Sequence, residues 1–181
     1  ACAPGAPTTK SRCQHAATAR LATRLKPAAV LVLGDLQYPR GSLRGFRASF
    51  GRTWGAVKDK TLPAPGNHEY RTEGASGYFR YFGLTPPAYR AVAIGTWRVY
   101  LLDSNCDRVD CAAERSWLRA DLAAHPVACS AIVLHHPRYS SGAEHGSDAS
   151  MASFWRIADR RGVDLALAGH DHAYERFAPM D

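Results

Sequence analysis

The side chains most able to do chemistry in this sequence stand directly after short apolar runs. Five of the eight histidines occupy such places, together with an aspartate and an asparagine. Imidazole nitrogens and carboxylate or amide oxygens are ligands of first-row transition metals. These positions therefore predict a metal site at which His68, His135, His136, His170 and His172 gather beside Asp35 and Asn67.

The spacing of these residues favours one shared site. His170 and His172 are two positions apart, so on an extended chain both imidazoles point to the same face. Asp35 carries two carboxylate oxygens and could bridge two ions. Two metal ions roughly 3.5–4 Å apart can generate hydroxide and stabilise both the attacking and the leaving oxygen of a phosphoryl displacement.

The elements that must position these residues alternate between strands and helices. Continuous apolar runs predict strands at 28–33, 130–134 and 163–168, with another approaching Leu62, and a hairpin at 91–94 and 97–102. Helical spacing predicts helices at 14–25, 42–57, 112–124 and 147–161, and an aromatic-rich loop or short helix at 74–83. This order predicts an α/β layered architecture with mixed sheets. The chemistry-bearing residues then lie at the carboxyl ends of strands, where open α/β sheets bind ligands.

Four motifs contain these residues: Gly34-Asp35-x-x-Tyr38, Gly66-Asn67-His68-Glu69, His135 after an apolar strand, and Gly169-His170-x-His172-x-Tyr174-Glu175-Arg176. They resemble the motifs of the calcineurin-like metallophosphoesterase superfamily, and the first and last resemble its purple acid phosphatase-like branch. The resemblance runs from about residue 30 to the C-terminus, with the motifs in the family's order. It implies a layered αββα sandwich.

The resemblance also implies a dinuclear centre of iron with zinc, manganese or a second iron. Asp35 would bridge the two ions, and Tyr38 and His172 would bind the first of them. The second ion would be held by Asn67, His135 and His170.

Three further histidines are candidate catalytic residues. The resemblance implies that His68 contacts the phosphate or the leaving group. His145, in the 140–147 loop, and His136 are candidates for substrate contact or proton donation. Glu69, Tyr174, Glu175 and Arg176 are predicted to be structural or to orient ligands, and Asp171 is predicted not to be a ligand.

One departure concerns the start of the chain. Members of this family carry an earlier aspartate, at the end of the first core strand, that binds the first metal. No acidic residue precedes Asp35. We therefore predict one catalytic domain over residues 1–181 that is incomplete at both ends and lacks its first core strand. The second metal site is predicted to be better formed than the first.

The net charge and the distribution of basic and apolar residues limit the kinds of partner that the sequence predicts. A net charge of +7 and a pI near 9.4 favour anionic partners. The basic residues are scattered, without a run of five or six, so nucleic acid is not the predicted partner. No apolar run approaches the roughly 18 residues of a membrane span. A small phosphate ester is the predicted substrate, and the oligomeric state is left open.

The cysteines bear on the compartment. Cys2 and Cys13 flank one short loop, and Cys106 and Cys111 flank another, which suggests two small-loop disulfides. Cys129 would then be unpaired, unless it pairs with Cys106 or Cys111, and free buried thiols remain an alternative. Disulfides favour a secreted or otherwise extracytoplasmic protein, although no hydrophobic leader stands at the start of this chain.

The predicted function is hydrolysis of phosphoric esters, most simply by an acid phosphatase-like phosphomonoesterase. A metal-bound hydroxide would attack phosphorus in line, and a histidine would protonate the leaving oxygen. A phosphodiesterase or nuclease of the same superfamily is the nearest alternative. A non-catalytic metal-binding remnant is a second alternative, and a nucleic-acid-binding module is a third.

Overall fold

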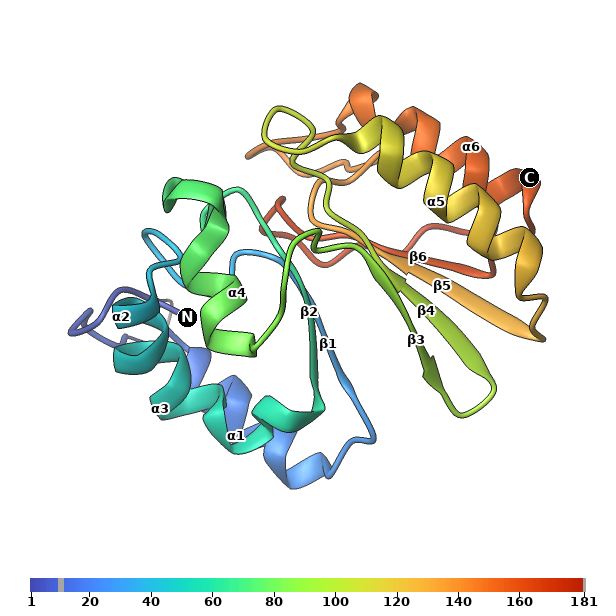
Figure 1. Ribbon diagram of the computed structural model, residues 1–181. Helices are drawn as coiled ribbons and strands as arrows, with labels where there is room; N and C mark the ends of the chain where they lie inside the picture. Colours follow the sequence, from blue (N-terminus) through green and yellow to red (C-terminus); the bar gives the residue numbers. More distant parts are fainter. Residues whose placement is uncertain (10–11, 181) are drawn as a thin grey trace.

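A computed structural model describes residues 1–9 and 12–180 of the chain. Two sheets lie face to face at the centre, and helices cover the outer side of each (Figure 1). Helices α1 to α4 lie beside the first sheet, and α5 and α6 run along the second. The predicted layered αββα arrangement is therefore confirmed.

The elements follow the predicted alternation closely. The strands are β1 Val30–Leu33, β2 Thr61–Ala64, β3 Arg90–Ile94, β4 Trp97–Leu101, β5 Cys129–Val133 and β6 Leu165–Leu167. The helices are α1 His15–Leu25, α2 Leu43–Gly45, α3 Gly51–Thr53, α4 Ser76–Phe82, α5 Cys111–Ala124 and α6 Ala152–Arg160. One π-helical turn, Phe46–Phe50, and four 3₁₀ turns, Trp54–Lys60, Glu69–Arg71, Glu73–Ala75 and Ala149–Met151, complete the regular structure of the described residues.

The second sheet is mixed, as predicted, whereas the two strands that form the first sheet run parallel. Strand β1 pairs in parallel with β2, from Val30 opposite Thr61 to Leu33 opposite Ala64. The second sheet has the order β3-β4-β5-β6, in which β3 and β4 form an antiparallel hairpin and the other pairs are parallel. Within residues 1–9 and 12–180 no further strand joins β1 and β2. The predicted absence of a first core strand stays a prediction.

Alternation along the strands separates an inner core from an outer one. Successive side chains of a strand point to opposite faces of its sheet. In β4, Val99 and Leu101 pack into the cluster between the two sheets, whereas Tyr100 packs outward against α5 and α6. In β5, Ala131 and Val133 face inward in the same way. These strands are apolar on both faces because helices cover one face and the other sheet covers the second.

An aromatic cluster joins the first sheet to its helices. Phe46, Phe50, Tyr78 and Phe79 are buried together with Leu36. The predicted 42–57 helix that supplies part of this cluster is divided into α2, the π-helical turn, α3 and a 3₁₀ turn. Glycine weakens a helix interior by roughly 1 kcal/mol relative to alanine, and three glycines, Gly45, Gly51 and Gly55, fall in this stretch.

Two other elements, one helix and one strand, are shorter than predicted. The 147–161 helix begins as a 3₁₀ turn at Ala149, where the Asp148 carboxylate accepts a hydrogen bond from Ser150 N. The 163–168 strand pairs only over Leu165–Leu167, because its ladder ends where β5 ends. Neither difference moves the residues that follow the strands.

The cysteines pair as the short loops suggested. Cys2 is bonded to Cys13 and Cys106 to Cys111, and Cys129 is free. Among the residues that the structure describes, no helix has the length and apolar character needed to cross a membrane.

Candidate metal centre

The carboxyl ends of four strands meet in one place between the two sheets. Asp35 follows β1, Asn67 follows β2, His135 follows β5 and His170 follows β6. Within each sheet the strands concerned run parallel, so their carboxyl ends share one edge. Residues more than one hundred positions apart in the sequence are thereby brought into contact.

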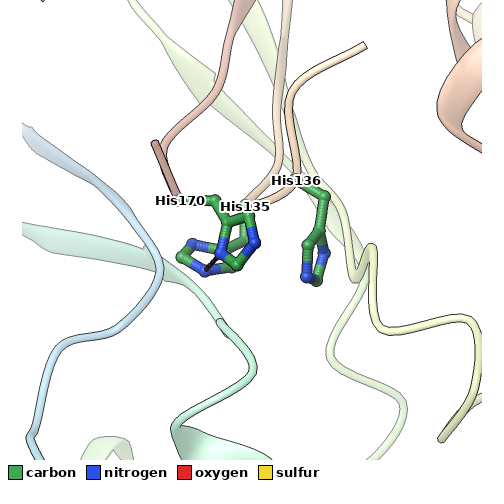
Figure 2. A group of neighbouring side chains, drawn as sticks. All are labelled: His135, His136 and His170. Atoms are coloured by element: carbon green, nitrogen blue, oxygen red, sulfur yellow. Dashed lines mark hydrogen bonds between the residues drawn. The ribbon is translucent and has the colours of Figure 1, made fainter. Parts of the chain in front are cut away.

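Four of the predicted ligands form a compact group, called here the buried side: Asp35, Asn67, His135 and His170. His135 Nε2 lies 3.1 Å from Asn67 Oδ1, 3.1 Å from His170 Nδ1 and 3.5 Å from Asp35 Oδ1. Figure 2 shows the rings of His135 and His170 in contact. His135 is 1% exposed, and Asp35, Asn67 and His170 are partly buried around it.

A backbone contact orients the imidazole of His135. Its Nδ1 lies 2.7 Å from the carbonyl oxygen of Leu33, the last residue of β1. A carbonyl can only accept, so the neutral ring carries its proton on Nδ1 and presents a lone pair at Nε2. That lone pair faces Asn67 Oδ1 and the carboxylate of Asp35.

The remaining two predicted ligands form what is called here the exposed side: Tyr38 and His172, with Glu144 beside them. The Tyr38 hydroxyl donates to Asp35 Oδ2 at 2.9 Å and lies 3.4 Å from His172 Nε2. His172 Nδ1 lies 3.0 Å from Glu144 Oε2. Both side chains of that pair are more than half exposed.

Close packing explains the glycines of two motifs. A Cβ on Gly34 would lie 2.4 Å from His135 Nδ1, and Gly34 has a φ of +88°. A Cβ on Gly66 would lie 2.3 Å from Asp35 Oδ1. Side chains at either position would collide with the predicted ligands. Asp35 and His170 themselves have positive φ angles, +52° and +68°, and such strained backbone clusters at functional sites.

His68 and His145 lie at the edge of the group. The backbone N–H of His68 donates to Asp35 Oδ1 at 2.9 Å, and its ring Nδ1 lies 2.8 Å from the Pro39 carbonyl oxygen. His145 stacks on His170 with ring centroids 4.1 Å apart. The structure therefore places two of the three candidate catalytic histidines beside the predicted ligands.

His136 also reaches the site, from the residue next to His135. Its ring centroid lies 4.6 Å from that of His170. One ring nitrogen from each of His135, His136 and His170 lies within 4.8 Å of the others, which is close enough for a metal site (Figure 2). On distance alone, His136 is thus either a further ligand or a substrate-contacting residue.

Two acidic residues brace the surrounding loops. The buried Glu69 carboxylate accepts from Gln37 N at 3.2 Å and from Gly66 N at 2.9 Å, which ties two motifs together. Asp171 accepts from the Ser140 hydroxyl at 2.6 Å, and so holds the loop that carries His145. The contacts of Glu69 agree with the supporting role predicted for it, and Asp171 was predicted only not to be a ligand.

Burial and charge set the protonation of the group. Burial alone would raise the pKa of Asp35, but His135, the N–H of His68 and the hydroxyl of Tyr38 together hold it below its usual value. Burial lowers the pKa of His135, and it lowers that of His170 to about 4. Both imidazoles are therefore neutral near neutral pH, the form that binds metals.

The donor set fits a transition-metal centre. An imidazole lone pair, an amide oxygen and a carboxylate oxygen converge on the buried side. Electron-rich atoms that face one another are stabilised by a cation between them. The chemistry of nitrogen and oxygen donors suits iron, zinc or manganese. The individual ligand roles stay predictions.

Two residues of the site were not singled out from the sequence. Ser104 follows β4 and contacts His136, and Glu144 contacts His172. Both lie in loops without a motif of their own. The only sequence signal for Ser104 is its position one residue past Asp103, after a strand.

Comparisons with known proteins agree with this fold and with the family that the motifs resemble. The family model described as calcineurin-like phosphoesterase matches residues 12–174. A curated relative, purple acid phosphatase 18 of Arabidopsis thaliana, is 29% identical over 109 residues. That match covers 58% of this chain and 23% of the relative, so the chain spans less than a quarter of that relative's length.

A solved structure shows the same fold. It is described as GAP50, the anchor in the inner membrane complex of Plasmodium, and it matches with a TM-score of 0.60 at 13% identity. The match covers 94% of this chain and 64% of that one. At this identity the likeness concerns the fold alone.

Proposed function

The chain belongs to the calcineurin-like phosphoesterase family, and we propose that it is a metal-dependent phosphoric ester hydrolase of the acid phosphatase type. Its substrates would be small phosphate monoesters. The match to a purple acid phosphatase and the Gly-Asp-x-x-Tyr motif at residues 34–38 support the monoester choice.

The observation that carries the proposal is the orientation of His135. Its Nδ1 is bound to the Leu33 carbonyl, and its Nε2 faces the oxygens of Asp35 and Asn67. A hydrogen bond at the distal nitrogen that fixes the tautomer is typical of metal-binding histidines.

The proposed centre holds two metal ions, iron with zinc, manganese or a second iron. Asp35, Tyr38 and His172 would hold one, and Asp35, Asn67, His135 and His170 the other. Bound ions would supply Lewis-acid activation of water and neutralise charge on the phosphoryl oxygens.

The protein's own groups would then bind and orient the ester. His68 sits against Asp35, with its ring anchored on the Pro39 carbonyl, and would contact a phosphoryl oxygen. His145 lies over His170 on a solvent-facing loop and would donate the proton that the leaving oxygen needs. General acid catalysis of this kind contributes typically 10²–10⁴-fold.

Two disulfides support an extracytoplasmic location for this activity. Disulfides persist in oxidising compartments and are rare in the cytosol. The net charge of +7 favours approach of an anionic ester.

Two measurements test the proposal. Elemental analysis of the purified chain should find two transition-metal ions per chain, including iron. Turnover of an aryl phosphate monoester should exceed turnover of the matching diester. A preference for the diester would replace the monoesterase with a phosphodiesterase, and bound metal without turnover of either ester would favour a non-catalytic metal protein.

A further inference from the structure

The hydroxyl of Ser104 lies at the centre of a small hydrogen-bond network behind the site. Ser104 comes three residues after the end of β4 and is 3% exposed. Its Oγ lies 3.2 Å from His135 N, 2.9 Å from His136 N and 2.8 Å from His136 Nδ1. One buried oxygen therefore touches both members of the His135-His136 pair.

The direction of each bond follows from what the groups can do. A backbone N–H can only donate, so Ser104 Oγ accepts from both His135 and His136. A serine hydroxyl has two acceptor lone pairs and one proton. With both lone pairs in use, the hydroxyl must donate its proton, and the acceptor within reach is His136 Nδ1.

This assignment fixes the tautomer of the neutral His136 ring. Nδ1 accepts the Ser104 proton, so the ring's own proton is on Nε2. In His135 the order is reversed, because Nδ1 donates to Leu33 and Nε2 is bare. Two adjacent histidines thus present opposite chemistry: His135 offers a lone pair, and His136 offers an N–H.

We propose that Ser104 is a positioning residue that makes His136 a hydrogen-bond donor to the bound phosphate ester and not a metal ligand. A metal ion requires a bare nitrogen, which His136 lacks at Nε2 and shares with Ser104 at Nδ1. His136 lies close to His135 and His170 (Figure 2). Its N–H would therefore reach an ester bound to the metal that His135 and His170 would hold. The role at the ester rests on the proposed function, whereas the tautomer does not.

The direct test is the tautomer of His136 in the unmodified protein. Two-bond ¹H–¹⁵N correlation spectra of ¹⁵N-histidine-labelled protein, at about pH 8, report which nitrogen of each neutral ring carries the proton. That pH lies above the ordinary imidazole pKa of about 6.5. We expect the proton on Nε2 of His136 and on Nδ1 of His135. A proton on Nδ1 of His136 would overturn the proposal.

Two substitutions at Ser104 separate the hydroxyl from the fold. Ser104→Thr keeps the hydroxyl and should keep the Nε2–H tautomer of His136. Ser104→Ala removes the donor and should yield a mixture of tautomers in a protein whose other histidine signals are unchanged. An unaltered His136 tautomer in a folded Ser104→Ala protein would contradict the assignment.

Metal stoichiometry distinguishes a donor from a ligand. His136→Gln should leave Zn²⁺ binding to the metal-free chain unchanged, whereas His135→Gln should lose one of the two ions. His125→Gln is the matched control, because His125 is exposed at the end of α5. The proposal would be overturned if His136→Gln lost an ion while the His125→Gln control retained both.

The contribution to the ester is measured with an aryl phosphate and with inorganic phosphate. His136→Gln should lower kcat/KM by roughly 10²-fold, the typical effect of removing one donor to a developing oxyanion. Inorganic phosphate should shift the Nε2–H signal of His136 in the metal-loaded protein. If the ester is not hydrolysed at all, the phosphatase proposal fails. If phosphate leaves the Nε2–H signal unmoved in an active enzyme, the donor role fails.

Discussion

His135 and His172 are both predicted metal ligands, one after strand β5 and one after strand β6, but the fold holds them differently. His135 is 1% exposed, and its free nitrogen is aimed by a bond to the backbone of β1. His172 has a side chain that is 54% exposed, and its partner is the side chain of Glu144, which is 55% exposed. A backbone contact with the sheet positions the histidine of the buried side. An exposed side chain from a loop positions the histidine of the exposed side.

The difference concerns preorganisation. Ligands fixed by backbone contacts lose little conformational freedom when a metal binds, whereas an exposed glutamate that must be ordered loses up to about 1.5–2 kcal/mol of side-chain entropy. The buried side should therefore bind its ion more tightly. This agrees in direction with the prediction that the second site is better formed, which metal occupancies have still to test.

The largest effect is expected at the residue that the two sides share. Asp35→Asn removes a carboxylate that touches His135 on one side and Tyr38 on the other. We expect loss of both ions and a fall in phosphatase kcat/KM of at least about a hundredfold, because the metals would supply the electrostatic stabilisation. The check is elemental analysis together with initial rates on an aryl phosphate.

Asp107→Asn is the matched control for that substitution. Asp107 is exposed, and within residues 1–9 and 12–180 its ion pair is with its neighbour Arg108. It should retain metal and rate. A phosphatase rate that survives Asp35→Asn unchanged would show that the activity does not use this centre.

The comparison itself is tested by removing one histidine from each side. His135→Gln should abolish the tighter of two Zn²⁺-binding steps, and His172→Gln should weaken only the looser one. Calorimetric titration of the metal-free chain measures both steps. If His172→Gln removes the tighter step, burial does not rank the two sides.

A buried carboxyl behind the tighter side should tie its stability to pH. Glu114 Oε1 accepts from Asp103 N at 2.8 Å, next to Ser104, and Glu114 Oε2 has no partner among the described residues. Burial raises the pKa of Glu114 from 4.5 to about 8. Between these values the folded state holds a proton that the unfolded state has released, so the free energy of unfolding falls as pH rises through this window.

Glu114→Gln should reduce that loss. The variant should match the wild type near pH 5 and exceed it near pH 9 by at most roughly 5 kcal/mol, since the pKa rises from 4.5 to about 8 and each unit of pKa shift corresponds to about 1.4 kcal/mol. Urea midpoints across this range give the measurement. Glu73→Gln, at an exposed position, should follow the wild-type curve. Parallel curves for Glu114→Gln and wild type would place the pH dependence elsewhere, with Glu69 the next residue to test because burial raises its pKa in the same direction.

The sequence predicted best what short-range patterns encode. Apolar runs located the strands of the described residues, and the fold brings the six predicted ligands that follow these strands together. Helical spacing was less reliable at 42–57, where glycines and the aromatic cluster of Phe46 and Phe50 impose irregular turns. The exact ends of β6 depend on its partner β5, which no local pattern contains.

The supporting contacts were beyond the sequence for a physical reason. The contact of Ser104 with His136 spans 32 positions and that of Glu144 with His172 spans 28, and both depend on how loops fold over a finished sheet. A serine or glutamate in a polar loop carries no periodicity that would distinguish it from its neighbours. Such residues become visible only when the tertiary structure places them against a motif.

Glu144 gives the smallest predicted effect and the finest test of the comparison. Glu144→Gln removes the carboxylate from His172 Nδ1 while keeping the shape of the side chain. Replacing a group that orients a metal ligand typically weakens metal binding 10–100-fold, and exposure to solvent should keep this case near the lower end, at about tenfold for the looser Zn²⁺-binding step. Titration calorimetry should show the tighter step unchanged. Glu175→Gln is the control, because Glu175 accepts a hydrogen bond from Ser141 N in the loop that carries Glu144. An equal weakening of both steps would mean that the two sides are coupled through Asp35 and do not bind their ions independently.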